Sequence, residues 1–232
     1  MQTVIETFES RAHEIQVYFK WVECVDLNFQ NKKQGITTPE SDEVIKILKA
    51  NVLMMLYNLV EATILGGILV IYDKLKKDGC TYIAVSDEIQ KIWFSFKFRQ
   101  VYDGQANYES YKGKAVEIVK AILNKEVIDL DRKATAISGN LDADKIRLIC
   151  NNHGIRIKSD SKNKGGCILS RVKNDRNNLS HGVISFAECG RDLSINDLRD
   201  MINQTNSFLG DVLSSFKDYY NNKLYLKSST GC

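Results

Sequence analysis

A single proline, Pro39, in a chain of 232 residues is the feature that most limits the possible folds. Proline breaks helix interiors and punctuates loops, so a chain almost without it suits long helices joined by few turns. The length is enough for one domain with a sizeable core. We therefore predict an all-α bundle of long antiparallel helices, forming one domain over residues 1–225 and followed by a flexible tail at 226–232.

Apolar residues recur at spacings of three and four along much of the chain, which indicates amphipathic helices. We expect Thr38 to cap the helix that starts at Pro39. Ser194 is expected to cap the last helix, with Asp197 completing a near capping box. The predicted helices cover residues 4–29, 41–77, 85–98, 108–123, 167–181 and 195–224.

The composition changes between about residues 126 and 166. Residues 126–137 alternate enough between apolar and polar side chains to predict a short strand, and residues 155–157 predict a second one. Between them lies a short helix that Asn140 or Asp142 is expected to cap. We therefore predict a small mixed α/β insertion between helices of the bundle.

The helix at 41–77 is apolar over a length that would span a membrane. Asn58 and Glu61 lie at the middle of that stretch, and a carboxylate at the centre of a bilayer costs roughly 2.5–3.5 kcal/mol. We therefore predict a core helix buried on nearly all sides, with no membrane partner. The first residues carry acids early and lack the layout of a signal peptide, so we expect a cytoplasmic protein.

Six cysteines are scattered through the chain, with no CxxC pair and no histidine at zinc-ligand spacing. We expect reduced thiols in the cytosol and no metal or cofactor. The net charge of +3, from 32 basic and 29 acidic residues, is close to balanced. Any surface that binds nucleic acid must therefore be a local basic one.

Arg176 occupies a position where the helical pattern requires an apolar residue. A buried charge needs a partner, so Arg176 calls for a carboxylate, a ring of acceptors or an anion-binding cleft between subunits. A structural ion pair with Glu61 or Asp175 is one explanation, and Glu61 is favoured because it also needs a partner inside the most apolar helix. The aliphatic residues on the same face are Leu169, Val172, Leu179 and Val183.

The residues after Arg176 suit phosphate chemistry. Asn177 and His181 are four residues apart, so the amide could orient the imidazole, and Arg176 and Ser180 form a second such pair. Histidine transfers protons near neutral pH, and arginine binds a phosphate whose charge increases in the transition state. Gly182 is expected to end the helix. His181 lies about 140° around an ideal helix from Arg176. Arg176 must therefore reach across, the helix must end near Gly182, or the working pair must form between two subunits.

The segment RNNLSH, residues 176–181, resembles the R-polar-x-x-x-H signature of the HEPN superfamily, with Asn177 in the polar position. Three longer segments, residues 53–64, 138–155 and 179–198, resemble one HEPN-like nuclease family found around toxin–antitoxin and phage-defence loci. Some HEPN proteins carry a tyrosine two residues after the histidine that a partner nucleotidyltransferase modifies. Val183 stands there in this chain, so the sequence does not support that form of regulation.

The resemblance implies a HEPN-type helical bundle that forms a homodimer and places two RNxxxH motifs around one cleft. It implies a metal-independent endoribonuclease, a toxin or phage-defence effector, in which the RNA 2′-hydroxyl attacks the neighbouring phosphodiester. His181 would be the general base or acid, Arg176 would hold the scissile phosphate, and Asn177 would assist. From their positions in the helices, we expect Ser180 and Glu61 to support these residues. A cognate antitoxin or defence-system protein is an expected partner. The alternative is a non-catalytic HEPN module that binds RNA or a partner protein.

Overall fold

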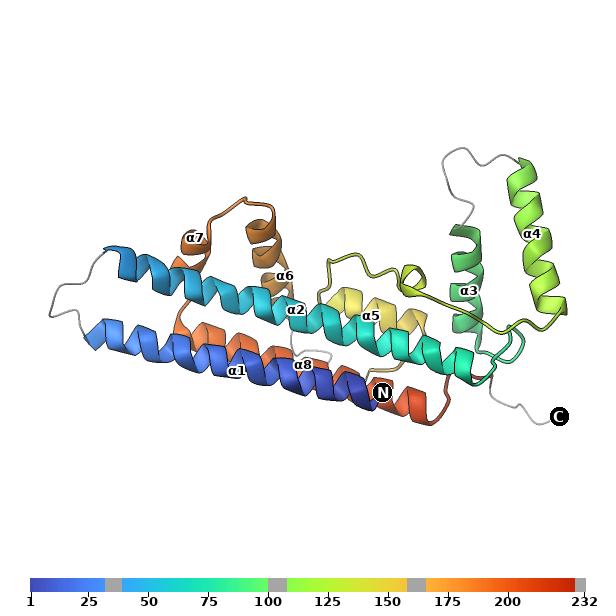
Figure 1. Ribbon diagram of the computed structural model, residues 1–232, viewed down its shortest axis with the longest axis horizontal. Helices are drawn as coiled ribbons and strands as arrows, with labels where there is room; N and C mark the ends of the chain where they lie inside the picture. The colour runs from blue at the N-terminus through green and yellow to red at the C-terminus, as the bar shows by residue number, and fades with distance from the viewer. Residues whose placement is uncertain (32–38, 100–107, 158–165, 228–232) are drawn as a thin grey trace.

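Three long helices lie side by side and form the frame of the molecule (Figure 1). In the computed structural model, which describes residues 1–31, 39–99, 108–157 and 166–227, α1 and α2 run antiparallel. Helix α8 lies alongside both and runs parallel to α2. The elements are α1 (Gln2–Asn31), α2 (Pro39–Lys77), α3 (Asp87–Arg99), α4 (Tyr108–Leu123), the 3-10 helix η2 (Arg132–Thr135), α5 (Ala143–Asn152), α6 (Gly166–Ser180), α7 (Phe186–Arg191) and α8 (Ile195–Asn221).

Helix α2 is the centre of the core, because it contacts α1, α6, α7, α8 and η2. Many of its apolar side chains are fully buried, among them Leu53, Leu56, Val60, Ile64 and Ile68. By length and composition α2 could also cross a membrane, but half of its most apolar stretch is buried inside the protein. This packing supports the predicted core helix.

Two glycines let other helices approach α2 closely. A Cβ atom on Gly67 would overlap the ring of Phe216 on α8, so this position admits no side chain without repacking. A Cβ atom on Gly190 of α7 would overlap the backbone of Lys46 on α2. Gly67, which weakens helix propensity, is therefore the residue that lets α8 pack on α2.

The shorter helices are attached to this frame in two places. Helices α6 and α7 pack on α2 toward one end of the bundle, whereas α3 and α4 stand across its other end (Figure 1). Between them, α5 contacts both α6 and α3. The result is a row of short elements along α2, in the order α7, α6, α5, η2 and α3.

Most of the predicted helix boundaries agree with the structure to within a few residues. Ser194 and Asp197 form a complete capping box at the start of α8. Asp142 caps α5, because its side chain accepts a hydrogen bond from the Lys145 N–H. The cap predicted at Thr38 lies outside the described residues. A helix that we did not predict, α7, begins with a second capping box between Ser185 and Glu188.

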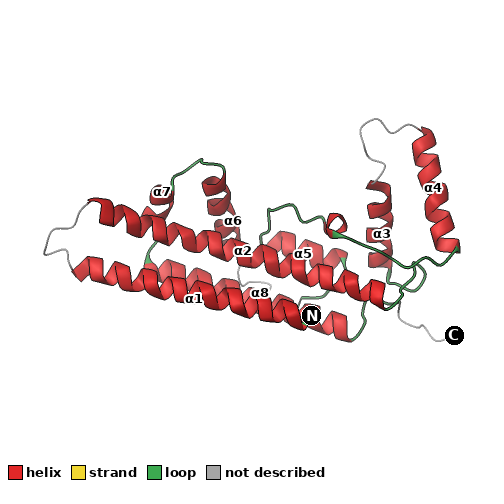
Figure 2. Cartoon of the chain, viewed as in Figure 1, coloured by secondary structure: helices red, strands yellow, loops and turns green. Residues whose placement is uncertain are grey.

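The predicted mixed α/β insertion is wrong, since the described residues contain no strand (Figure 2). Residues 126–131 are extended, but their pairing is limited to one isolated bridge between Thr81 and Val127. Asp131 then caps the 3-10 helix η2. The alternation of residues 126–137 arises because Ile128, Leu130 and Ile137 are buried, without any sheet. Residues 155–157 also lie outside any strand.

The first residues of the predicted tail are held in place. Leu226 forms an isolated bridge with Val85, and the Lys227 N–H donates to the Ala84 carbonyl at 3.0 Å. The remaining tail, residues 228–232, lies outside the described residues.

Candidate active site around Arg176

Helix α6 carries the motif and ends directly after it. Leu169, Val172 and Leu179 are buried, which fixes the face that α6 turns toward the core. Gly182 adopts a φ of 66°, the left-handed conformation typical of helix C-termini. The Val183 N–H donates to the Asn178 carbonyl at 2.8 Å and the Gly182 N–H to the Leu179 carbonyl at 3.2 Å, which completes a Schellman motif.

Because α6 ends early, Val183 does not lie on the apolar face that we predicted for this helix. Val183 is 69% exposed, because the chain leaves the helical path at Gly182. The apolar face therefore consists of residues before the helix end, with Arg176 as its polar member.

Arg176 is half-buried and lies over an aromatic ring. Its guanidinium carbon is 4.4 Å from the centre of the Tyr57 ring on α2, which is a cation–π contact. One terminal N–H donates to the Asn177 Oδ1 at 3.0 Å. The Nε–H is buried and has no hydrogen-bond partner among the described residues. Because a buried unpaired donor is costly, Arg176 retains a strong capacity to bind an acceptor.

Asn177 connects Arg176 to the segment before α5. Its Nδ2 donates to the Asn140 Oδ1 at 2.7 Å, while its Oδ1 accepts from Arg176. The predicted bond from Asn177 to the His181 imidazole is absent among the described residues. Asn177 therefore positions Arg176, and Asn140, which we considered as a helix cap, fixes Asn177.

His181 is the C-cap residue of α6 and is exposed. Its backbone N–H donates to the Asn177 carbonyl at 3.0 Å, so its backbone still follows the helix. The Ser180 hydroxyl donates to the Arg176 carbonyl at 2.8 Å, so its hydrogen bond lies within the helix. His181 thus presents an accessible imidazole at the end of the same helix that holds Arg176.

The floor of the site is Tyr57 on α2. Its hydroxyl accepts a hydrogen bond from the Leu141 N–H at 3.1 Å, which ties α2 to the segment before α5. Burial raises the pKa of Tyr57, and the positive charge of Arg176 opposes that rise. Tyr57 is therefore a neutral platform under the guanidinium.

Glu61, one turn along α2 from Tyr57, does not pair with Arg176 as we predicted. Its carboxylate lies 3.9 Å from Arg132 of η2. Asp175, the other carboxylate considered, pairs with Arg171 at 3.6 Å. Stacking on Tyr57 has taken the place of the expected ion pair, so the positive charge of Arg176 is not neutralised by either acid.

A second cation stands one turn before Arg176. Lys173 donates to the Asp142 carboxylate at 2.6 Å, which joins α6 to the N-terminus of α5. Burial alone raises the pKa of Asp142, but the hydrogen bonds from Lys173 and the Lys145 N–H outweigh it, and the net effect lowers that pKa. Helix α6 is therefore attached at two points to the segment that leads into α5, at Asn140 and at the N-cap Asp142.

Comparison of the sequence with family profiles shows which family the chain belongs to. The profile of the HEPN_MAE_28990-like HEPN family matches residues 1–225. The chain belongs to this HEPN family. No curated protein and no solved structure matches the chain.

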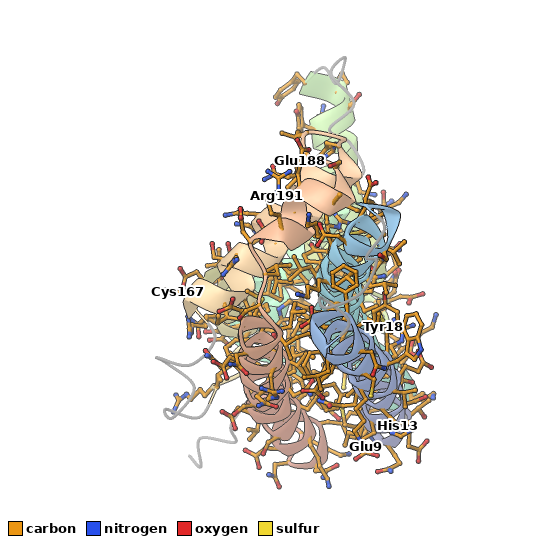
Figure 3. The ribbon with its side chains drawn as sticks, turned by 90° about the vertical axis from the view of Figure 1, so that its left-hand side faces the viewer. Glu9, His13, Tyr18, Cys167, Glu188 and Arg191 are labelled. Carbon is orange, nitrogen blue, oxygen red and sulfur yellow. The ribbon has the colours of Figure 1, made fainter. Side chains whose placement is uncertain are left out.

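The other two histidines of this HEPN chain, His153 and His13, are not part of the candidate site. His153 is buried, where its Nδ1 bonds the Ile149 carbonyl at 2.7 Å and its Nε2 bonds the Tyr72 hydroxyl at 2.7 Å. Burial lowers the pKa of His153 to about 4. His13 lies on the outer face of α1, across the end-on view from Cys167 at the start of α6 (Figure 3).

Tyr57 and Lys173 also lie at the candidate site, although we predicted no role for either from the sequence. Tyr57 stands four residues before Glu61 on the most apolar helix, so the two side chains share one face. A polar hydroxyl at that position could have indicated that Tyr57 belongs to the site. Lys173 lies three residues before Arg176, on the adjacent turn. Among the described residues, no group of three or more His, Cys, Asp and Glu side chains is arranged to hold a metal ion.

Proposed function

We propose that the chain is a metal-independent endoribonuclease whose site is formed by Arg176, Asn177 and His181. One observation carries the proposal. In an intact RNxxxH motif, Arg176 lies on Tyr57 with a buried Nε–H that has no hydrogen-bond partner among the described residues. A phosphate oxygen is the acceptor that such a fixed guanidinium suits best.

The proposed reaction needs only groups of the RNA and the protein. The RNA 2′-oxygen attacks the neighbouring phosphorus while an imidazole of His181 accepts its proton. The bond from phosphorus to the 5′-oxygen breaks, and a second imidazole supplies the proton that the leaving oxygen takes up. Arg176 stabilises the charge that increases on the phosphoryl oxygens. The products are a 2′,3′-cyclic phosphate and a 5′-hydroxyl.

A homodimer supplies the second imidazole. Arg176 is half-buried whereas His181 is exposed at the end of α6, so a symmetric partner can approach His181 and leave Arg176 on its platform. Mixing His181→Ala with the parent should lower cleavage by more than dilution alone, because a dimer with one subunit of each kind retains a single imidazole. Sedimentation that gives a monomer at micromolar concentration would contradict this arrangement.

The cleavage products test the reaction itself. We expect purified protein to cut single-stranded RNA in the presence of EDTA and to leave 2′,3′-cyclic phosphate ends. The matched control is the same sequence with 2′-O-methyl groups, which lacks the attacking hydroxyl and should remain intact. Cleavage of the methylated strand at the same rate would rule out the proposed chemistry.

One observation favours a non-catalytic HEPN module as the second candidate. The Asn177 amide bonds Asn140 and Arg176, so it does not orient His181. A binding module would retain RNA or a partner protein without cleaving it, and Arg176→Ala would lose only binding. Detection of cyclic phosphate ends separates the two candidates. In either case we propose a cytoplasmic toxin or phage-defence protein, held inactive by an antitoxin or another defence component.

A further inference from the structure

A basic cleft lies between α3, η2 and α5. Its volume is about 420 Å³. Lys91 and Arg99 of α3 and Lys145 of α5 line it, and Glu88 is the carboxylate among the lining residues. The cleft thus carries three cations against one acid. Its polar lining also includes Ser95, Thr135, Asn151 and Asn152.

The charge of this cleft sets it apart from two larger ones. The cleft of about 560 Å³ between α1 and α2 has Arg11 against Glu6 and Glu14. The cleft of about 800 Å³ beside Tyr219 has two cations, Arg156 and Lys227, against three carboxylates. Both larger clefts therefore carry an excess of negative charge, which disfavours an anionic ligand.

The cations of the basic cleft are available to a ligand. The side chains of Lys91 and Lys145 form no ion pair within the described residues. Arg99 uses one terminal N–H on the Lys133 carbonyl at 3.4 Å, which positions the guanidinium and leaves its other donors. Two ammonium groups beside one guanidinium suit successive phosphates of a flexible chain.

Contacts along α2 connect the basic cleft to Arg176. Tyr57, under Arg176, is one helical turn from Glu61, and Glu61 pairs with Arg132 of η2 at 3.9 Å. The next residue of η2, Lys133, accepts the hydrogen bond from Arg99. Helices α6, α5 and α3 follow one another in the same order along α2 (Figure 1). Arg132, the cation between the two places, is paired with Glu61 and adds no net charge there.

We propose that the cleft between α3, η2 and α5 binds the sugar–phosphate backbone of single-stranded RNA. The placement of that strand toward Arg176 rests on the proposed function, but binding in the cleft does not. A single strand can bend its backbone into a cleft of this size, and phosphate contacts do not depend on base sequence. The cleft would bind a part of the RNA that is distant from the reacting phosphate. This additional contact would increase the affinity of the protein for RNA.

The test measures binding to 2′-O-methyl RNA, which the proposed chemistry cannot cleave. The probe is a fluorescent strand of about 20 nucleotides, longer than the roughly 4–16 nucleotides of a typical single-strand site. The variant is Lys91→Gln/Lys145→Gln. The matched control is Lys20→Gln/Lys217→Gln, which removes the same charge from exposed positions of α1 and α8 outside the cleft.

We expect the cleft variant to bind about tenfold more weakly than the control at about 0.1 M salt. The slope of log affinity against log salt should become shallower by about 1.4, which is about 0.7 for each lost phosphate contact of a single strand. Equal affinity and slope for the two variants would overturn the proposal. Tighter binding of a polyglutamate peptide than of RNA, lost in the same variant, would overturn it in favour of an acidic protein partner.

Cleavage measured in parallel separates this inference from the proposed function. If both hold, the cleft variant has a raised KM and an unchanged kcat on the unmethylated strand. Salt-dependent binding in the cleft without any cleavage would refute the nuclease and leave the cleft as an RNA site. Cleavage with identical KM in the cleft variant and its control would refute the cleft and leave the nuclease.

Discussion

The guanidinium of Arg176 stacks on the ring of Tyr57, with 4.4 Å between the guanidinium carbon and the ring centre. The two residues are 119 positions apart in the chain, and the contact joins the motif helix to the core helix. It holds a positive charge at the surface of the core without an acid to neutralise it. This relationship makes Tyr57 the first target for mutation.

Replacing Tyr57 with leucine should weaken the site, because it removes the aromatic face under Arg176. A cation–π contact contributes about 0.5–2 kcal/mol, so we expect kcat/KM for RNA cleavage to fall by about 2–30-fold. Tyr57→Phe keeps the ring and should retain most of the activity. Because the Leu141 N–H then loses its acceptor, we expect Tyr57→Phe to reduce the free energy of unfolding by about 1–3 kcal/mol. A greater loss of activity in the phenylalanine variant would argue against stacking.

Asn140→Ala should reduce kcat by about tenfold with little effect on stability. The bond from Asn177 to Asn140 is at the surface, so its loss costs little folding energy but releases the amide that positions Arg176. Asn140→Asp keeps an oxygen that accepts from Asn177, and it should retain more activity. Equal activity of the alanine variant and the parent would remove Asn140 from the site.

Gly67→Ala should destabilise the protein by about 1–3 kcal/mol, because the new methyl group overlaps the buried ring of Phe216. The neighbouring Gly66→Ala is the control, since its Cβ would lie 3.7 Å from the Val4 side chain, an ordinary contact. Alanine has the higher helix propensity, so Gly66→Ala should stabilise by up to about 1 kcal/mol. Denaturant unfolding of both variants measures the difference, and similar midpoints would contradict the packing of α8 on α2.

His153 should make stability depend on pH. Its pKa is about 4 in the folded protein, below the ordinary value of 6.5, because burial disfavours the charged ring. The unfolded chain therefore binds more protons between these values, and stability that is complete above about pH 6.5 decreases as the pH falls toward 4. The loss is on the order of 3 kcal/mol. Unfolding midpoints of the parent at several pH values should show this decrease, and His153→Gln should reduce it.

Local signals in the sequence explain why most of the fold could be predicted. The scarcity of proline and the spacing of apolar residues indicated the long helices. Ser194 marked the start of α8, and Asp142, one of the two caps considered, is the cap of α5. The same kind of signal, Ser185 followed by Glu188, was present before α7, a helix that we did not predict. The alternation at 126–137 misled us because one extended segment packed against a bundle has the same pattern as a strand.

The partners of the site residues could not be predicted, because they come from distant parts of the chain. The sequence indicated that Arg176 needed a partner. Either an ion pair with Glu61 or a contact with the Tyr57 ring could stabilise the charge of Arg176. Which one forms depends on Arg132, which takes Glu61 in the folded protein. The same limit applies to Asn177, whose partner Asn140 is 37 residues away.

The rate of RNA cleavage by single-site variants tests the central claim most directly. With a fixed single-stranded RNA in EDTA, we expect His181→Ala to cleave about 10²–10⁴-fold more slowly than the parent. Arg176→Ala should lose a similar amount, because it stabilises charge in the transition state. Both variants should remain folded, as judged by their circular dichroism spectra. Cleavage by either variant at the rate of the parent would contradict the assignment of the site.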